Sequence, residues 1–408
     1  MRILVLTQWY PPEPMQLFAD LAKELQLQGQ EVIVITGFPN WPTGKLYPGY
    51  QLRLWQKETI DNIQVIRLFL VPDHSSSAFY RIINLASFFF TTIGVAMFLI
   101  RKPDVIHAVQ PPTVGWAAWV LSCMWRVPFT YEVQDMWPES LAATGLIENE
   151  RILRMIGWFS RWVYSRAAAV RVISPGFRTN LISKGVASQK IHVISNWVDT
   201  TYYRPEHWNE VIARELGFTG HFNVVYAGVI GVSQGLETVL EAAVFLHDAP
   251  KIQFIIIGEG TERKRLEESA KILGISNVRF LGQYPSEAMS GLFALADVLL
   301  VQLKNSPLFR ITVPHKIFAY MASGKPILAA VEGDAAQVVR EADAGLICEP
   351  GNPIALADAV RCFAAFSQRE REILGENARR AACHCYNRER LVGEIGAMLE
   401  VVVSGKKW

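Results

Sequence analysis

The chain alternates short, continuous apolar runs with longer segments in which apolar residues recur every three or four positions. A continuous apolar run is typical of a strand buried on both faces of a parallel sheet, and the longer pattern is typical of an amphipathic helix. In the first half, the strand-like runs lie at residues 3–7, 32–36, and about 63–68, 104–109, 128–133, 169–173 and 190–194. A helix is expected at about 16–28, with Gly29 as its stop.

A second series of strand-like runs follows residues 197–221, which show weak periodicity, contain Pro205 and are predicted to be a linker. These runs lie at 222–227, 252–257, 278–281, 298–302, 327–330 and 345–348, and amphipathic patterns follow at about 353–366 and 387–403. A chain of 408 residues is too long for one typical core. We therefore expect an α/β protein with two Rossmann-like domains facing a cleft, at 1–200 and 201–380, and a C-terminal helix in 381–408 packing back across the hinge.

Residues 82–100 carry no charge and lie between Arg81 and Arg101-Lys102. The stretch is long enough to span a bilayer. It includes polar residues such as Asn84, and it separates two strands predicted for one sheet, which a span would place on opposite sides of a membrane. Three interpretations remain open: a core helix, a helix in the plane of a membrane surface, and a true span.

Residues 151–166 combine four arginines with Trp158, Phe159 and Trp162. This composition is typical of a helix at a membrane interface. A core helix with an exposed basic edge would show the same pattern.

Composition narrows the class of protein. Half of the residues are hydrophobic and 19% are charged, which argues against disorder. The net charge of +2 argues against a nucleic-acid partner. The five cysteines are scattered, as in a reducing compartment. Cys383-His384-Cys385 has no second ligand pair nearby, so we expect no metal site.

The most informative segment is TVPHKIFAYMASGKPILAA, residues 312–330. Pro314 fixes a turn, Lys316 stands at the entrance to a short helix, and Gly324 helps to end it. A cation beside free N–H groups at a helix N-terminus suits an anion such as a diphosphate. An ordinary helix–turn–strand corner with a surface lysine is the alternative.

Two glycine loops follow predicted strands of the second domain. The first contains Gly228, Gly231 and Gly235, in a GxxGxxxG spacing that differs from the dinucleotide GxGxxG. The second contains Gly258 and Gly260 before a helix. Glycine lets the backbone approach a ligand closely. Together with the lysine loop, they indicate that this domain holds a nucleotide diphosphate, whereas a dehydrogenase is disfavoured.

The first domain offers carboxylates at predicted strand ends. Asp135 and Glu139 lie in QDMWPES, and Glu13 follows the first strand. Asp135 would face the cleft, or else cap a helix or form a turn. The turn-rich loop PNWPTGKLYPGY, residues 39–50, is of the kind that packs on sugar rings. His107 follows an apolar run at a predicted strand end and is explained equally well as an active-site group or as a buried, hydrogen-bonded histidine.

These motifs resemble the retaining glycosyltransferases of the GT-B fold, in the large family four, and the match runs nearly end to end. The segments that carry the resemblance are YPPEP, GFPNWPTGKLYPGY, QDMWPES, RVISPGF, YAGVIGVSQGLETVLEAA, FIIIGEGTERKRL and PHKIFAYMASGKPILA. The loops GFPNWPTGKLYPGY and QDMWPES resemble the subgroup that builds bacterial surface polysaccharides, including fucosyl and N-acetylfucosaminyl transferases.

The resemblance implies a nucleotide-sugar donor on the C-terminal domain and a glycan or lipid-linked glycan acceptor on the N-terminal domain. It implies retention of configuration without metal or cofactor. We expect UDP to be favoured over GDP, and the protein to lie in the cytoplasm, bound peripherally to the inner face of the cytoplasmic membrane. The donor residues that we expect are Gly228, Gly231, Gln234, Gly235, Gly258, Glu259, Pro314, His315 and Lys316. We expect Glu13, Trp41 and Glu139 on the acceptor side, and our hypothesis makes Asp135 and Lys316 the catalytic pair.

The chain also departs from the family pattern. The family usually has two glutamates eight positions apart in its last donor loop, where this chain has Ile311 and Ala319. Gln234 stands where lysine is common, and Glu13-Pro14-Met15 replaces a glycine pair. Two alternative functions therefore remain open. One is a sugar-nucleotide epimerase of the same fold, and the other is a non-catalytic subunit that only binds the sugar nucleotide.

Overall fold

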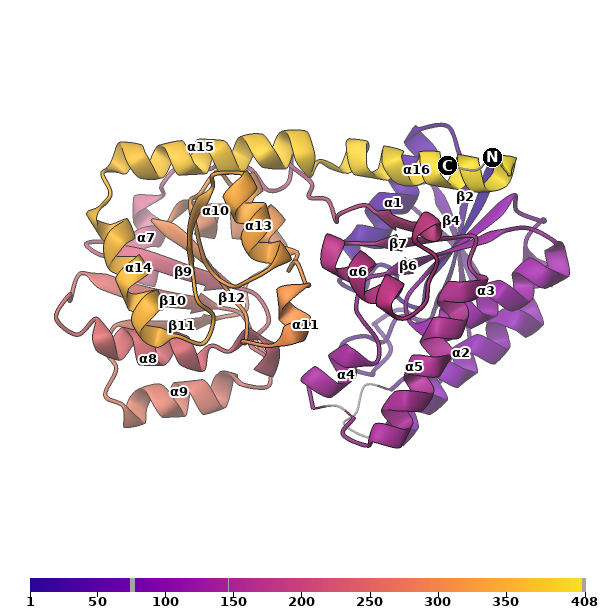
Figure 1. The fold of residues 1–408 in the computed structure, drawn as a ribbon, viewed down its shortest axis with the longest axis horizontal. Coiled ribbons are helices and arrows are strands. Elements are labelled where there is room, and N and C mark those ends of the chain that lie inside the picture. The colour runs from indigo at the N-terminus through magenta and orange to yellow at the C-terminus, as the bar shows by residue number, and fades with distance from the viewer. Residues whose placement is uncertain (74–77, 146, 406–408) are drawn as a thin grey trace. The chain divides into compact units, whose positions relative to one another are not determined.

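The structure is a computed structural model that describes residues 1–73, 78–145 and 147–405. The chain divides into two compact units (Figure 1). The first unit comprises Met1–Ser195 with Arg388–Trp408, and the second comprises Asn196–Asn387. Each is an α/β domain built on its own largely parallel sheet, as the alternating pattern predicts.

The first unit contains an eight-stranded sheet in the order β3-β4-β2-β1-β5-β6-β7-β8. Its strands are β1 (Arg2–Leu6), β2 (Glu31–Gly37), β3 (Trp55–Ile60), β4 (Ile63–Leu68), β5 (Val105–Val109), β6 (Phe129–Val133), β7 (Ala169–Val172) and β8 (Ile191–Val193). The central strand β1 pairs with β2 and β5, placing Ile3 opposite both Val32 and Val105. These central strands are buried, which explains their continuous apolar sequences.

Strand β3 is absent from the sequence-based prediction. It is an edge strand, antiparallel to β4, and its residues alternate between exposed and half-buried. Asp61 and Asn62 form the two-residue turn to β4, both with positive φ. An edge strand with one face in water needs no apolar run, so its polar sequence gave no strand signal.

The helices of the first unit are α1 (Gln16–Leu27), α2 (Ala78–Leu99), α3 (Pro112–Trp125), α4 (Glu139–Ala143), α5 (Glu150–Arg166), α6 (Pro175–Ser183) and α16 (Arg388–Ser404), with a short 3₁₀ turn at Ser188–Lys190. Helix α16 packs on α1. Arg388 lies 3.3 Å from Asp20 and 3.5 Å from Glu24 of that helix. The C-terminal helix is therefore part of the first unit.

Helix α2 is long and apolar enough to cross a membrane, judged by length and composition alone. It connects β4 and β5 of one sheet and packs against α3. Asn84 accepts a hydrogen bond from Gln8 and donates one to the carbonyl of Val71. Because these contacts hold α2 against the sheet, they argue against a transmembrane span.

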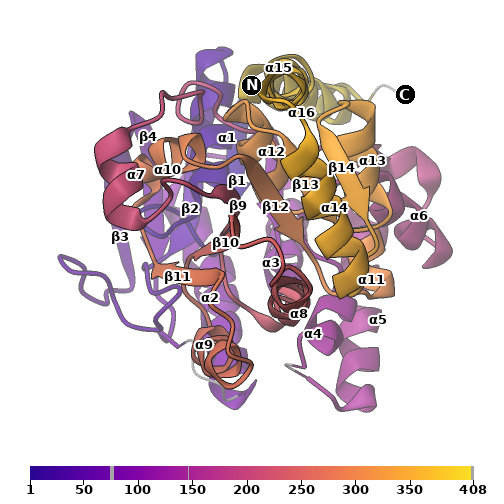
Figure 2. The same ribbon diagram turned by 90° about the vertical axis from the view of Figure 1, so that its left-hand side faces the viewer.

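The second unit contains a six-stranded parallel sheet in the order β11-β10-β9-β12-β13-β14, seen strand by strand in Figure 2. Its strands are β9 (Phe222–Ala227), β10 (Ile252–Ile257), β11 (Val278–Gly282), β12 (Val298–Gln302), β13 (Ile327–Ala330) and β14 (Gly345–Cys348). Each predicted strand of this domain is confirmed. Five are buried or half-buried along their whole length, and β11 exposes one residue.

The helices of the second unit are α7 (Glu210–Leu216), α8 (Glu237–Phe245), α9 (Arg263–Ile272), α10 (Met289–Ala294), α11 (Pro307–Arg310), α12 (Lys316–Ala322), α13 (Asp334–Glu341), α14 (Pro353–Ala365) and α15 (Gln368–Cys385), with 3₁₀ turns at Val232–Gln234 and Ser286–Ala288. The predicted linker is partly wrong, because α7 lies within it, capped by Asn209 and ended by Gly217. Helix α15 was also missed, although Ser367 and Glu370 form a capping box at its start.

Candidate functional site

The two glycine loops of the second unit lie directly against each other. Gly228 follows β9 with φ +141°, and Gly258 follows β10 with φ +144°. A Cβ atom at Gly258 would lie 1.9 Å from the carbonyl oxygen of Gly228, and one at Gly260 would lie 2.1 Å from that of Ile230. Only glycine fits where two backbones pass this closely. Both loops therefore belong to one surface at the carboxyl ends of β9 and β10.

Lys316 extends from the start of α12 to this surface. Its Nζ donates to Oε1 of Gln234 over 3.0 Å and lies 3.8 Å from the ring centroid of Tyr226. A Cβ atom at Gly228 would lie 3.0 Å from the same Nζ. Within the described ranges, no carboxylate forms an ion pair with this ammonium group. The site therefore contains a cation without a counter-charge, and burial lowers the pKa of Lys316 to about 7.

Tyr226 was not predicted as a site residue, because it lies inside an apolar strand pattern. Its hydroxyl is 2.7 Å from the carbonyl oxygen of Val229 and 2.9 Å from Oε1 of Gln234. Its ring contributes a cation–π contact with Lys316. Tyr226 thus contacts the glycine loop, Gln234 and the lysine together.

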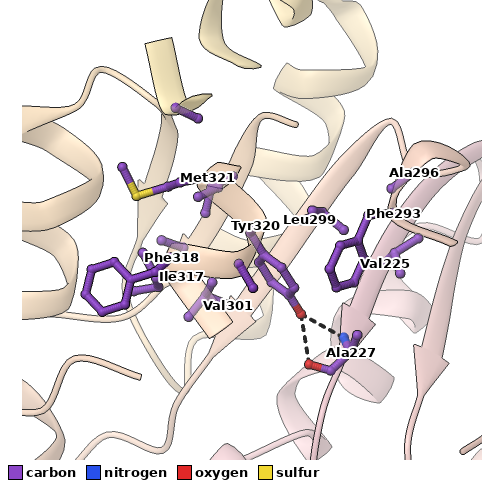
Figure 3. Close-up of a cluster of buried hydrophobic side chains, with 14 of the residues drawn as sticks. Val225, Ala227, Phe293, Ala296, Leu299, Val301, Ile317, Phe318, Tyr320 and Met321 are labelled. Carbon is purple, nitrogen blue, oxygen red and sulfur yellow. Dashed lines mark hydrogen bonds between the residues drawn. The ribbon is translucent and has the colours of Figure 1, made fainter. Parts of the chain in front are cut away.

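Tyr320, one turn after Lys316, fixes α12 to the sheet. Its hydroxyl donates to the carbonyl oxygen of Ala227 over 2.9 Å and accepts from the N–H of the same residue over 2.8 Å, as Figure 3 shows. Ala227 is the last residue of β9, directly before Gly228. The helix that carries the cation is therefore bonded to the strand that carries the glycine loop.

The other predicted donor residues are placed as follows. Gly231 and Gly235 flank the 3₁₀ turn that contains Gln234, and Gly235 has φ +61°. Glu259 forms an ion pair with Arg263, and Pro314 accepts a backbone bond from Ile317. The imidazole Nε2 of His315 lies 2.9 Å from the carbonyl oxygen of Trp197 and so donates to it. The side chains of Glu259 and His315 are thus held by protein partners.

Lys304 was not predicted as a site residue. It is a second cation near the first glycine loop. It is exposed, and its backbone N–H donates to the carbonyl of Ser233 over 2.9 Å. Its position two residues after β12 was the available signal, because ligands bind at the carboxyl ends of parallel strands.

The two positions that lack the family glutamates have different surroundings. Ala319 is buried in the apolar cluster around α12. Ile311 is half-buried and directly follows α11. Nearby, Arg310 forms an ion pair with Glu332 at 2.8 Å. Ala319 suits its apolar surroundings, where a carboxylate would need a polar partner.

In the first unit, Asp135 lies two residues after β6, as predicted from the sequence. The backbone N–H groups of Gln134 and Asp135 both donate to Oε1 of Gln110, over 2.9 and 2.8 Å. Asp135 is exposed as a residue, although desolvation of its carboxyl group raises its pKa. In the part of the chain that the structure describes, nothing donates a hydrogen bond to its carboxylate, which is therefore available to a ligand.

Glu13 has a structural role in this unit. It is buried, and its carboxylate accepts from the backbone N–H groups of Tyr10, Asn40 and Trp41 over 2.8 to 3.0 Å. Burial raises the pKa of Glu13, partly offset by these bonds. The carboxylate thus holds the start of the loop that follows β2. Trp41 is half-buried, and the two residues after it are exposed.

Glu139 and His107 are also held by protein partners. Glu139, the first residue of α4, lies 2.5 Å from Nζ of Lys184. His107 is buried in β5, with one ring nitrogen 2.9 Å from Oγ1 of Thr130 and the other 3.0 Å from Glu132. The alternative of a buried, hydrogen-bonded histidine is confirmed.

Two family models together match most of the chain. Residues 16–197 match the glycosyl transferase 4-like domain, and residues 210–381 match the glycosyl transferases group 1. WcaI of Escherichia coli (strain K12), named for glycosyl transfer in colanic acid biosynthesis, is 28% identical over 79% of this chain and 82% of its own length. WbjE of Pseudomonas aeruginosa, named a glycosyltransferase, is 27% identical over 55% of this chain and 57% of its own length.

Solved structures show the same fold. Sucrose-phosphate synthase from Thermosynechococcus elongatus superposes with a TM-score of 0.79 over 100% of both chains, at 18% identity. HepE of Anabaena, solved with UDP and glucose, superposes with a TM-score of 0.74 over 98% of this chain and 99% of its own, at 19% identity. The chain belongs to the group 1 glycosyl transferases and has the GT-B fold.

Proposed function

We propose that the protein transfers a hexose or deoxyhexose, with retention of configuration, from a UDP-sugar to a glycan or lipid-linked glycan during bacterial surface-polysaccharide synthesis. The observation that carries the donor assignment is Lys316, an ammonium group without a carboxylate partner within the described ranges, beside two glycine loops. A diphosphate supplies the missing negative charge, and the glycines leave room for it to approach the backbone.

The relatives support this choice of substrates. WcaI is named for colanic acid biosynthesis, and HepE was solved with UDP-glucose as well as with UDP and glucose. UDP is therefore the first nucleotide to test, with GDP as its competitor. The fucosyl and N-acetylfucosaminyl subgroup remains part of the proposal.

In the proposed reaction the nucleoside diphosphate is the leaving group. Lys316 stabilises the negative charge that develops on it as the glycosidic bond breaks. The sugar becomes oxocarbenium-like, and the acceptor hydroxyl attacks from the face that the diphosphate leaves. A phosphate oxygen of the donor takes the proton of this hydroxyl. The proposal uses no metal, because Lys316 supplies the positive charge beside the leaving diphosphate. Asp135 orients the acceptor or stabilises positive charge on the sugar.

Calorimetry with UDP and GDP tests the donor site, using the wild type, Lys316→Ala and the exposed-lysine control Lys251→Ala. We expect the wild type and the control to bind UDP and Lys316→Ala to bind it weakly. Turnover of Lys316→Ala should fall by about 100-fold or more, as for loss of an oxyanion-type donor. Normal UDP affinity and turnover in Lys316→Ala would show that this lysine neither binds the diphosphate nor contributes to catalysis.

The non-catalytic alternative rests on Ile311 and Ala319, which replace two carboxylates of the family pattern. It predicts UDP-sugar binding with neither hydrolysis nor transfer. The epimerase alternative predicts a changed sugar configuration without any acceptor. Incubation with a labelled UDP-sugar and a membrane extract separates the three functions, because only a transferase moves the label into lipid or glycan.

A further inference from the structure

Helix α2 has polar side chains on its buried side and large apolar side chains on its exposed side, the opposite of an ordinary surface helix. Its buried side includes Asn84 and Thr92, whose side chains are hydrogen-bonded within the protein. Its exposed side carries Ile82, Phe90 and Phe98, with 59, 65 and 86% of each residue exposed. Within Tyr80–Leu99, only 28% of the most apolar 18-residue window is buried. The buried side thus combines Asn84 and Thr92 with Phe88 and Ala96, and the helix presents a largely apolar side outward.

Helix α5 lies in the same layer of the first unit, with α3 between it and α2 (Figure 1). Aromatic rings join the three helices: the ring centroids of Phe89 and Trp116 are 5.5 Å apart, and those of Trp116 and Phe159 are 4.6 Å apart. A further pair, Trp119 and Trp162, is 4.7 Å apart. The two outer helices are thus parts of one packed surface.

Exposed arginines and apolar side chains alternate along α5. Met155 and Trp158 are 63 and 59% exposed. Arg151, Arg154, Arg161 and Arg166 are exposed on the same helix. Tryptophan and arginine together are typical of helices at the boundary between lipid headgroups and acyl chains.

We propose that the exposed sides of α2 and α5 bind the surface of a membrane rich in anionic lipids. The apolar side chains of α2 enter the acyl boundary, and the arginines of α5 contact the headgroups. Charge complementarity selects this occupant, because an anionic bilayer satisfies both the apolar side chains of α2 and the arginines of α5 in the same helical layer. The inference is independent of the donor site, since it uses no residue of the second unit.

Flotation of the full-length protein with lipid vesicles tests this surface. The probes are vesicles of phosphatidylcholine alone and vesicles that also contain phosphatidylglycerol. We expect binding to the anionic vesicles, weakened by about tenfold or more in the double variant Ile82→Ser, Phe98→Ser, because two apolar side chains no longer leave water. Both residues are largely exposed, so their replacement leaves the core intact.

The matched control replaces exposed apolar residues outside this surface, Ile272→Ser with Leu273→Ser, which are 85 and 53% exposed in the wild type. It should bind like the wild type. The variant Arg154→Gln, Arg161→Gln should lose about fivefold in affinity per arginine, and only for anionic vesicles. Raising the salt from about 0.1 to 1 M should reproduce that loss by screening.

Two results would overturn the proposal. One is equal vesicle binding by the wild type and the Ile82→Ser, Phe98→Ser variant. The other is a wild-type dimer that ignores vesicles and becomes monomeric in that variant, which would make the surface an interface between two copies of the chain. Size-exclusion chromatography with light scattering measures the second result directly.

Discussion

Gln234 and Lys316, 82 residues apart in sequence, are joined by a 3.0 Å hydrogen bond from Nζ to Oε1. The same Oε1 lies 2.9 Å from the hydroxyl of Tyr226. The family often has lysine at the position of Gln234, which would place a second cation there. In this chain the neutral amide instead orients the Lys316 ammonium group through its oxygen.

Replacing Gln234 by leucine removes that acceptor while keeping similar bulk. We expect UDP affinity to fall by about tenfold, the usual scale for a hydrogen bond to a charged group. Calorimetry measures the loss, and Gln337→Leu, an exposed glutamine on α13, is the matched control. Equal UDP affinity in Gln234→Leu and the wild type would show that the amide does not position the lysine.

The lowered pKa of Lys316 predicts that UDP binding takes up a proton. Burial lowers this pKa to about 7 in the free protein, and a bound diphosphate raises it by favouring the charged form. UDP affinity should therefore fall as the pH rises above about 7. The lysine is then mostly neutral in the free protein, and the free-energy cost of protonating it on binding grows with pH.

Calorimetry at about pH 8, in buffers that differ in ionisation enthalpy, measures this proton uptake. Lys316→Arg is the control, since arginine stays charged and should bind UDP without gaining a proton there. Identical binding enthalpies of the wild type in all buffers would contradict the linkage.

Asp135→Asn should reduce transfer without lowering stability, because desolvation raises the pKa of this carboxyl group and the neutral amide removes that cost. Asp135 is an exposed residue, but desolvation of its carboxylate raises its pKa, and no described residue donates a hydrogen bond to it, so its charge does not stabilise the fold. We expect turnover to fall by about 100-fold, with a melting temperature no lower than that of the wild type.

The comparison variant is Glu139→Gln, which breaks an ion pair with Lys184 and should alter stability more than turnover. Steady-state kinetics and thermal unfolding of both variants separate the two roles. Unchanged kinetics in Asp135→Asn would leave this aspartate as a turn-forming residue.

Gly258→Ala should destabilise the donor loops. Its Cβ atom would lie 1.9 Å from the carbonyl oxygen of Gly228, at a φ of +144° that other residues rarely adopt. We expect a loss of about 2 kcal/mol or more in the free energy of unfolding. Urea unfolding measures it, with Gly291→Ala as the control, because a Cβ there meets nothing within 4 Å. Similar stability of the two variants would show that the loops can separate at little cost.

The sequence predicted the strands of both sheets well where burial on two faces requires continuous apolar runs, as in β1 and β9. It failed where one face meets water, as in β3, and where caps rather than apolar periodicity define a short helix, as in α7. The site was predicted through glycine and lysine, whose chemistry is visible locally. Tyr226 and Tyr320 were missed because they resemble core residues until the tertiary contacts of their hydroxyl groups are known.

The bond between Tyr320 and Ala227 has a consequence for the thermodynamics of ligand binding. Lys316 is carried by a seven-residue helix whose next turn is tied to the end of β9. The conformational entropy of placing that cation is therefore lost when the domain folds, not when the nucleotide arrives. A site preorganised in this way binds its anion with less entropic opposition than one that must first order a flexible lysine loop.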